Sequence, residues 1–585
     1  MAGPPIRQPP AAPSTGIALA THRALVDALA RPAAWPVALP EGARFERIET
    51  HISSLLLAGD GVLKLKKPLT LPFLDFASPA QRRHFCEEEL RLNRRTAPGI
   101  YRAVLPVLGP ATAPRVAAPA GATAEAPDAS GLPVIDWALW MRRFDQTLLY
   151  DHLAAAGALG GGRIDALATA IAAFHAGLPP SPPAFGDPDA FAAWVAGTLH
   201  ELRTPPLAGL LPDDAATLAA LATWSADRAT ALRPLMTARR TAGAVIEGHG
   251  DLHLANIVEL DGRPCLFDAL EFAPALRHTD RIADLAFPFM DLLDHGLPRL
   301  AWRLLSGVLD ASGDHAGLPA LRWLAAYRAL VRAKVALLGA LQVEAGAGRR
   351  AASVAAARRR VGLAARLAWP TAPAPLVLTC GLSGSGKSTV ALMLAERLGA
   401  VRVRSDVERK RLHGLAPTAR PADPALLYGT DSTRRTYAQL LAAARAALAG
   451  GIGVVLDAAY LRQAERQQAL ALARELGAPA WVVHCEAPLT TLAARVQRRQ
   501  ADASDPSDAD LGVLARQQAW QEPPAADEPL QRLDTDASLD EVARRVDALV
   551  ALLGPVAGPF DIRQPDAAAW ADDADRALSD TGGKR

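Results

Sequence analysis

The sequence predicts two folded domains, an N-terminal α+β domain and a C-terminal α/β domain with a parallel five-stranded sheet. At 585 residues the chain is too long for one hydrophobic core, since a prior of roughly 150 residues per domain suggests three or four compact units. A Pro-rich stretch, residues 369–375, ends a helical pattern and marks a linker. From residue 376 to 554, apolar strand-like runs alternate with amphipathic helical patterns, which favours a parallel sheet.

The second domain opens with LVLTCGLSGSGKST, residues 376–389, an apolar strand followed by a glycine-rich turn and a helix start. Its centre matches the phosphate-loop pattern G-x-x-x-x-G-K-S/T, in which glycines let backbone N–H groups approach phosphate oxygens. Lys387 is expected to reach the β- and γ-phosphates and Ser388 to ligate Mg²⁺. A flexible turn is the alternative. The sequence therefore predicts binding of ATP and Mg²⁺ by Gly381, Ser383, Gly384, Ser385, Gly386, Lys387, Ser388 and Thr389.

Composition limits the cellular setting. Formal net charge is +2, so no bulk field demands nucleic acid or a membrane as partner. The four cysteines lie far apart, three of them in apolar runs, and we expect reduced thiols rather than disulfides or metal ligands. Because the Pro-rich N-terminus has no apolar signal-peptide core and no apolar run is long enough to span a bilayer, we expect a cytoplasmic protein.

The first domain begins after a segment, residues 1–19, that we expect to be disordered. ISSLLLAGDGVLKLKKP, residues 52–68, predicts two strands around a Gly-Asp-Gly turn, with Lys64 and Lys66 on one face. The helical segment that follows carries three consecutive glutamates, Glu87, Glu88 and Glu89. A strand lysine facing a helical glutamate orients ATP phosphates in protein-kinase-like folds. A charged surface hairpin beside a charged helix is the alternative.

Residues 110–133 are rich in Ala, Pro and Gly, and we expect a flexible insertion there. Residues 137–145 predict a further strand. The most informative stretch is GHGDLHLANIVELDGRPCLFDALEF, residues 248–272, in which Asp251 and Asn256 have the spacing of the Asp and Asn of a kinase catalytic loop.

A hairpin register follows from this stretch. Asp261-Gly262 is a strong two-residue turn signal, and pairing Leu260 with Arg263 sets Asn256 opposite Phe267. Asn256 and Asp268 then lie side by side and offer oxygen ligands to Mg²⁺, while Asp251 precedes them as a candidate base. Capping residues on an ordinary hairpin are the alternative. We expect His249 and His253 to be hydrogen-bonding scaffold rather than metal ligands.

On these residues, the segment 20–368 resembles the aminoglycoside-phosphotransferase-like kinases, which have a bilobal, protein-kinase-like fold. The resemblance implies that Asp251 is the catalytic base and that Asn256 and Asp268 hold the metal. It also implies that Lys64 or Lys66 orients ATP, with Glu88 or a neighbouring glutamate as its partner. No G-x-G-x-x-G turn is present, so residues 49–54 would have to cover the phosphates.

The charge of the expected acceptor lobe argues against a polycationic aminoglycoside as substrate. Residues 297–368 carry twelve Lys and Arg residues but only three acidic residues, Asp310, Asp314 and Glu344. A solvated helix face or an anionic acceptor would both account for this excess.

After the phosphate loop, further strands are expected to end at Ser405-Asp406 and at Asp457, followed by strands at 481–488 and 530–535. In a parallel sheet, residues at the carboxyl ends of strands face the ligand. We therefore expect Asp457 near Mg²⁺ and Asp406 near the γ-phosphate, with a helix N-cap as the alternative role of Asp406. Arg495 and Arg499 share a helical face, as a lid over the phosphates requires.

This second segment resembles the small phosphate-loop kinases, including polynucleotide kinase, gluconate kinase and chloramphenicol phosphotransferase. The match is specific at the strand-Ser-Asp-x-x-Arg stretch, Ser405 to Arg409. The resemblance implies that Asp406 is the catalytic base, that Arg409 contacts the acceptor, and that Arg495 and Arg499 belong to a lid.

The sequence thus predicts a bifunctional ATP-dependent phosphotransferase, with two kinase-type domains that each phosphorylate a hydroxyl of a small-molecule acceptor, possibly anionic. Two alternatives remain open. One is a regulatory nucleotide-binding protein with one or both halves catalytically idle. The other is a nucleic-acid 5′-hydroxyl kinase in the C-terminal half, for which only six tyrosines give no obvious stacking platform. Residues 555–585 are expected to be a tail.

Overall fold

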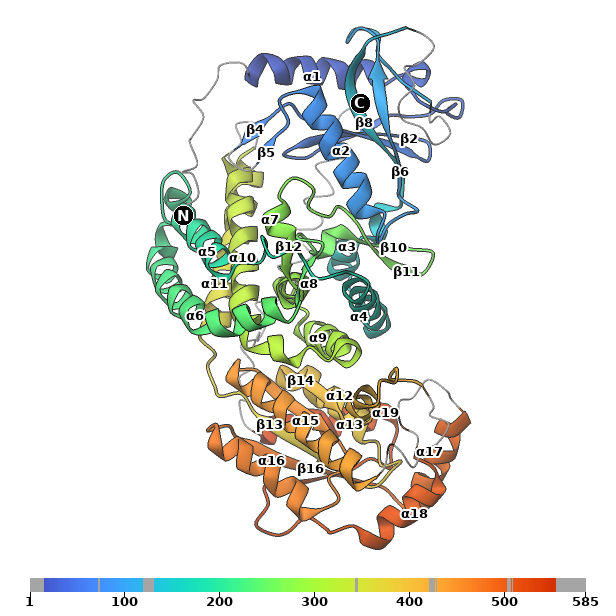
Figure 1. The fold of residues 1–585 in the computed structure, drawn as a ribbon, viewed down its shortest axis with the longest axis vertical. Helices are drawn as coiled ribbons and strands as arrows, with labels where there is room; N and C mark the ends of the chain where they lie inside the picture. The colour runs from blue at the N-terminus through green and yellow to red at the C-terminus, as the bar shows by residue number, and fades with distance from the viewer. Residues whose placement is uncertain are drawn as a thin grey trace. The chain divides into compact units, whose positions relative to one another are not determined.

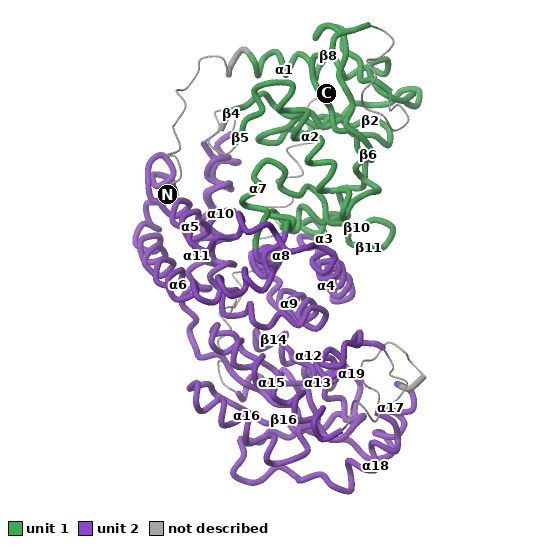
Figure 2. Tube along the Cα trace, viewed as in Figure 1, with its two compact units in different colours: residues 1–153, 247–279 green, residues 154–246, 280–585 purple. Residues whose placement is uncertain are grey.

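The computed structural model describes residues 15–71, 74–118, 131–341, 346–419, 427, 429–501, 507 and 509–553. The chain divides into two compact units (Figure 2). Unit 1 consists of residues 1–153 and 247–279, and unit 2 of residues 154–246 and 280–585. Neither border between the units falls at the predicted linker, residues 369–375, so the predicted domain boundaries remain predictions.

Unit 1 is built on a six-stranded sheet with the order β1-β2-β3-β8-β6-β7. Its strands and helices are α1 (Thr15–Leu29), β1 (Glu46–Glu49), β2 (Ser53–Ala58), β3 (Gly61–Lys66), β4 (Thr70–Leu71), β5 (Leu74–Asp75), α2 (Pro79–Asn93), β6 (Tyr101–Leu108), β7 (Arg115–Val116), β8 (Val134–Arg142), β10 (Ile257–Leu260), β11 (Arg263–Leu266) and α7 (Pro274–Arg277).

Two apolar clusters cover this sheet. In one, Leu25 and Leu29 of α1 pack with Leu63, Leu65 and neighbouring residues of the sheet. In the other, Val62, Cys86 of α2, Tyr101 and Val258 of β10 pack together. Because successive residues of a strand point to opposite faces of the sheet, strand β3 contributes side chains to both clusters. The second cluster holds α2 and the β10–β11 hairpin against the sheet.

Two predictions about the edges of this region require correction. Residues 15–19 were predicted to be disordered together with residues 1–14, but they are helical, because α1 begins at Thr15 and includes the apolar pattern of residues 17–20. The predicted insertion, residues 110–133, contains strand β7, which pairs with β6 and buries Val116. Residues 1–14, 119–130 and 555–585 lie outside the described residues.

Unit 2 contains a helical region and a parallel sheet. The helices before the sheet are α4 (Gly161–Ala176), α5 (Pro188–Leu202), α6 (Ala215–Thr241), α8 (Arg281–Asp294), α9 (Pro298–Ser312), α10 (Leu318–Ala340) and α11 (Ala347–Ala368). Short elements at the borders between the units are α3 (Tyr150–Ala155), β9 (Val245–Glu247) and β12 (His278–Asp280).

The rest of unit 2 is an α/β region (Figure 1). Its elements are β13 (Leu376–Cys380), α12 (Lys387–Leu398), β14 (Ala400–Arg404), α13 (Ser405–Leu412), α15 (Thr430–Ala449), β15 (Gly453–Asp457), α16 (Gln463–Glu475), β16 (Ala480–Glu486), α17 (Leu489–Ala501), α18 (Leu511–Trp520), β17 (Leu530–Asp534) and α19 (Leu539–Leu552).

The sheet of this α/β region is parallel and five-stranded, with the order β14-β15-β13-β16-β17, which confirms the predicted C-terminal fold class. Every residue of β13 and of β15 is buried, and α12 and α19 pack on one face through Val390, Leu394 and Val546. A near-continuous apolar strand is typical of a parallel sheet that is covered on both faces. Gly399 ends α12 in the left-handed conformation, which glycine adopts without steric cost.

The four cysteines are free thiols, and Cys86, Cys380 and Cys485 are buried. Burial raises the pKa of each of these three thiols, so they stay protonated at neutral pH. Across the described part of the chain, no helix combines the length and apolar character needed to cross a bilayer.

A buried ion pair gives a test of the packing in the α/β region. Arg466 of α16 is fully buried and donates to both carboxylate oxygens of Glu528, at 2.6 and 3.0 Å, and to the carbonyl of Tyr460. Arg466→Ala would leave the Glu528 carboxylate buried and unpaired, so we expect a loss of about 3–5 kcal/mol in the free energy of unfolding. Urea denaturation of the full chain measures this loss.

Arg445→Ala is the matched control, because Arg445 makes a similar two-bonded pair with Glu475 on the exposed surface. The unfolding transition of this control should stay close to that of the wild type. Equal shifts for the two variants would contradict the packing described for Arg466.

Candidate active sites

The phosphate-loop segment connects β13 to α12, and its glycines occupy places where a side chain would collide. Gly381 has φ +140°, and a Cβ there would lie 2.5 Å from the carbonyl oxygen of Cys485. Gly384 has φ +85°, and a Cβ there would lie 2.6 Å from the carbonyl oxygen of Leu492. Gly386 also has positive φ and precedes α12. This backbone is open to close approach by a phosphate, at the positive end of a twelve-residue helix.

Lys387 and Ser388 form the first turn of α12. The Lys387 ammonium donates to the carbonyl oxygen of Leu382 at 2.6 Å, which folds the lysine back over the loop. Ser388 Oγ donates to Asp457 Oδ1 at 3.1 Å. Asp457 ends β15, the neighbour of β13, so parallel pairing brings the two predicted metal ligands together. A hydroxyl and a carboxylate suit Mg²⁺, which completes its octahedron with phosphate oxygens and water, so these residues fit the ion.

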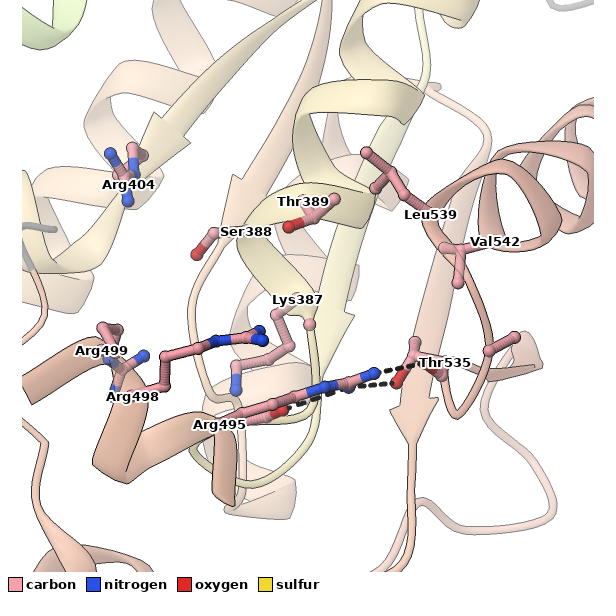
Figure 3. Close-up of a pocket in the computed structure, with 13 residues that line it drawn as sticks. Lys387, Ser388, Thr389, Arg404, Arg495, Arg498, Arg499, Thr535, Leu539 and Val542 are labelled. Atoms are coloured by element: carbon pink, nitrogen blue, oxygen red, sulfur yellow. Dashed lines mark hydrogen bonds between the residues drawn. The ribbon is translucent and has the colours of Figure 1, made fainter. Parts of the chain in front are cut away.

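A cavity of 670 Å³, which we call the first cavity, opens at this loop (Figure 3). Five cations line it and, among its described lining residues, no Asp or Glu does. Arg495 donates to the carbonyl oxygen of Thr535 at 2.7 Å and extends toward that residue in Figure 3, whereas the Arg498 side chain points toward Lys387. A cavity with this charge fits a polyanion. The five cations are Lys387, Arg404, Arg495, Arg498 and Arg499.

A second cavity, of 560 Å³, adjoins the first. Asp406 and Arg409, both on α13, line only this second cavity. Four residues line both cavities, so the two meet at the phosphate loop: Lys387, Ser388, Arg404 and Arg499. The predicted phosphate and metal ligands Lys387 and Ser388 therefore lie where the two cavities meet. The predicted base Asp406 and the predicted acceptor contact Arg409 lie in the second cavity alone.

Asp406 does not act as a helix cap. The N-cap position of α13 is Arg404, which makes no side-chain capping bond, and Asp406 lies in the first turn of the helix. Arg409 follows one turn later, is largely buried, and donates to the carbonyl of Leu427 at 3.2 Å. Arg499 donates to the carbonyl of Ala509 at 3.2 Å. These contacts hold the arginines beside the second cavity.

In unit 1, the strand lysines and a helical glutamate form a buried cluster. Glu89 of α2 accepts from Lys64 at 2.7 Å and from Lys66 at 2.8 Å, which agrees with the prediction that both lysines share a face. Burial alone would raise the pKa of Glu89, but the two lysines outweigh it and hold that pKa at about 2. Lys66 also pairs with Glu271, whereas Lys64 pairs with Asp268 at 2.6 Å.

The glutamate in this cluster is Glu89 rather than Glu88. The carboxylate of Glu88 instead accepts from Arg91 at 3.0 Å and from Arg277 at 3.1 Å. Adjacent helical residues point about 100° apart, and the sequence did not reveal which of the three glutamates faces the sheet. Glu89 is fully buried and Glu88 is not.

The predicted hairpin register is confirmed, because Leu260 pairs with Arg263, and Phe267 N donates to Asn256 O at 3.0 Å. Asn256 Nδ2 donates to the carbonyl of Asp251 at 2.9 Å, so the Asn fixes the loop that carries the candidate base. Asp268 has φ +59°, and its N–H donates to the hydroxyl of Tyr101 at 3.1 Å. These oxygen-bearing side chains are of the type that Mg²⁺ prefers.

The histidines beside this hairpin have structural contacts. His249 Nε2 lies 2.9 Å from the carbonyl of Phe267, and His253 Nε2 lies 3.5 Å from Asp251 Oδ2. Within residues 49–54, β1 ends at Glu49 and β2 begins at Ser53, and Lys67 donates to the carbonyl of Thr50.

Sequence reasoning missed several residues of both sites. Glu271 follows Asp268 by three residues and neutralises Lys66, but no motif marked it. Arg498 lines the first cavity although only Arg495 and Arg499 had been singled out; the Arg498-Arg499 doublet was the available signal. Trp520, which lines the second cavity, lies 63 positions from Asp457 and 116 from Arg404, the strand residues that line it too, and left no local pattern.

The comparisons with known proteins agree with the C-terminal fold. Residues 376–524 match the model of the AAA domain family. Among solved structures, the gluconokinase from Sinorhizobium meliloti 1021 is 24% identical, with a TM-score of 0.23, and covers 31% of this chain and 93% of its own. The Mycobacterium tuberculosis APS kinase CysC in complex with AMPPNP and APS is 22% identical, with a TM-score of 0.22, and covers 31% and 98%.

Relatives of known sequence cover more of the chain. Uncharacterized protein Rv2004c of Mycobacterium tuberculosis H37Rv and Uncharacterized protein Mb2027c of Mycobacterium bovis are each 31% identical over 477 residues. The match spans 80% of this chain and 89% of each relative. A match of 477 residues is longer than the matched AAA domain and longer than either half of the chain, so it includes residues from both halves. The chain therefore belongs to the family of these mycobacterial proteins and carries an AAA-type phosphate-loop domain in its C-terminal part.

Proposed function

We propose that the C-terminal half is a kinase that transfers the γ-phosphoryl group of ATP to a hydroxyl of a small-molecule acceptor. The observation that carries this proposal is the meeting of two cavities at Lys387 and Ser388. A nucleotide in the first cavity, whose described lining residues include no Asp or Glu, would present its terminal phosphate at the junction. An acceptor in the second cavity would then lie beside Asp406, on the other side of the phosphate.

In this mechanism Asp406 accepts the proton of the acceptor hydroxyl, and the hydroxyl oxygen attacks the γ-phosphorus as the bond to the β-phosphate oxygen breaks. Lys387, Arg404 and Arg499 stabilise the negative charge at the junction. Ser388 and Asp457 would hold Mg²⁺, which neutralises phosphate charge when bound. Catalysis of this kind depends on positioning and electrostatics and needs no covalent intermediate.

We infer a second phosphotransfer site in the N-terminal half, of the aminoglycoside-phosphotransferase-like type. The support is the cluster of Lys64, Glu89 and Asp268 together with the loop that Asn256 fixes around Asp251. Lys64 is the better candidate for the ATP-orienting lysine, because it contacts the candidate metal ligand Asp268. Asp251 would accept the hydroxyl proton there, and Asn256 and Asp268 would hold Mg²⁺.

The acceptor of the C-terminal half is proposed to be an anion. Apart from the residues shared with the first cavity, four arginines line the second cavity, against the acidic residues Asp406, Asp457 and Glu465. An acceptor that carries a carboxylate, sulfate or phosphate would balance this charge. The four arginines are Arg409, Arg434, Arg462 and Arg516.

One observation favours a second candidate, a kinase that acts on a nucleic-acid 5′-hydroxyl. The guanidinium of Arg462 lies 5.2 Å from the ring centre of Trp520, and both residues line the second cavity. A stacked Arg–Trp pair is a platform on which a nucleobase can lie. Incubation with γ-labelled ATP and a metabolite extract, beside a 5′-hydroxyl oligonucleotide, separates the two candidates by which acceptor becomes labelled.

Asp406→Ala tests the C-terminal half. If Asp406 is the general base, transfer of label from ATP in that half should fall by about 10²–10⁴-fold, while ATP binding at the phosphate loop is kept. Rates are measured with the acceptor identified above, and binding is measured by calorimetry. A variant that retains turnover, or that loses ATP binding and turnover together, would refute the assigned role.

Lys64→Ala and Lys66→Ala form a matched pair for the N-terminal half, measured in an Asp406→Asn background that silences the other half. Lys64→Ala should lower label transfer by about 10²-fold, the cost of removing one electrostatic contact to the transition state. Lys66→Ala should mainly destabilise unit 1, because it leaves the buried Glu89 and Glu271 short of a cation. The reverse pattern would make Lys66 the ATP-orienting residue.

A further inference from the structure

Helix α9 lies before the linker in the sequence, yet it packs against β14 and α12 of the α/β region within the same compact unit. Two of its side chains bind one residue of β14. Ser306 Oγ accepts from the backbone N–H of Arg402 at 3.0 Å, and Asp310 Oδ2 accepts from the Arg402 guanidinium at 3.0 Å. The Asp310 and Arg402 side chains are 15% and 12% exposed, so water screens this ion pair only weakly. Helix α9 thus fixes the edge strand of the sheet.

Strand β14 connects this contact to the phosphate loop through a second arginine, Arg404. Side chains two apart on a strand share a face, so Arg402 and Arg404 point the same way. Arg404 is the register partner of Asp457 on β15, and its Nε lies 3.4 Å from Asp457 Oδ2. The other oxygen of Asp457 accepts from Ser388 at 3.1 Å. Asp457 is therefore shared between an arginine and the serine that would hold the metal.

A second contact runs from the same turn of α9 to α13. Arg411 donates to the carbonyl oxygens of Asp310 and Leu309, and its side chain covers Gly313, where a Cβ would lie 2.6 Å from Arg411 Nε. Helix α13 presents Asp406 and Arg409 to the second cavity. The end of α9 therefore anchors both the strand beside Asp457 and the helix that carries Asp406.

We propose that Asp310 is a positioning residue of the phosphate-loop site, so that the helical segment before the linker completes the metal-binding end of that site. The inference rests on the proposed function, namely binding of a magnesium–nucleotide complex at the loop. Asp310 pairs with Arg402 and Asp457 pairs with Arg404, and the two arginines lie two residues apart on β14. Without the Asp310 carboxylate, Arg404 holds Asp457 more tightly, and Asp457 becomes a poorer ligand for Mg²⁺. The C-terminal half is then not independent of the helices that precede it.

The test is Asp310→Asn in the full chain, a substitution that keeps the shape of the side chain and removes its charge. ADP binding is measured by calorimetry with and without Mg²⁺. We expect affinity in the presence of Mg²⁺ to fall about tenfold, as for outer partners of metal ligands, and metal-free affinity to stay unchanged. A loss of stability with the same Mg²⁺ dependence as the wild type would make Asp310 a packing residue only and overturn the proposal.

Asp294→Asn is the matched control, since the Asp294 side chain on α8 is 6% exposed and pairs with Arg360 at 2.7 Å, outside both cavities. It should leave both ADP affinities unchanged. In an Arg404→Gln background, Asp310→Asn should have no further effect on the Mg²⁺ dependence, because the arginine that connects Asp310 to Asp457 through β14 is already absent. If Asp310→Asn does not fold, Ser306→Ala replaces it, with a smaller loss of the same kind expected. A wild-type protein that binds no ADP would instead overturn the proposed function, and this inference with it.

Discussion

An excess of positive charge around the phosphate loop is the constraint on which the rest of the C-terminal site depends. Lys387 and Arg404 line the first cavity with three arginines of α17, and no carboxylate lies among the described residues that line it. Cations held this close repel one another in a partly buried site, so the arrangement favours a state in which a polyanion supplies the missing charge. Burial lowers the pKa of the Lys387 ammonium. The glycine-rich backbone of the loop then needs only to leave space for the anion.

In the N-terminal cluster, acidic side chains of the protein balance the charge of the lysines. Lys66 is buried and Lys64 is half-buried, like Lys387, but Glu89, Asp268 and Glu271 balance the two N-terminal lysines from within the protein. Such a cluster holds its geometry without a ligand, and its lysines keep raised pKa values because the carboxylates outweigh burial. A ligand has to compete with Asp268 for Lys64. The two halves therefore differ in how strongly the site alone attracts an anion.

Patterns local in the sequence were predicted correctly, whereas contacts that depend on how a helix packs were not. The phosphate loop and the β10–β11 register follow from turn chemistry and strand alternation, which depend on neighbouring residues. The choice of Glu89 over Glu88 depends on how α2 is rotated against the sheet, which is a matter of packing. The contact of Asp310 with Arg402 joins residues 92 positions apart and crosses the predicted linker. In the sequence, Asp310 appeared only as one of the few acids in a basic segment.

In the proposed reaction, one of the two cavities that meet at Lys387 binds the nucleotide and the other binds the acceptor. The most direct measurement is a crystal structure with Mg²⁺ and a non-hydrolysable ATP analogue. The account predicts adenine and ribose in the first cavity, the metal beside Ser388 and Asp457, and the γ-phosphate facing Asp406 across an open second cavity. A nucleotide base in the second cavity, or a γ-phosphate directed away from Asp406, would contradict it.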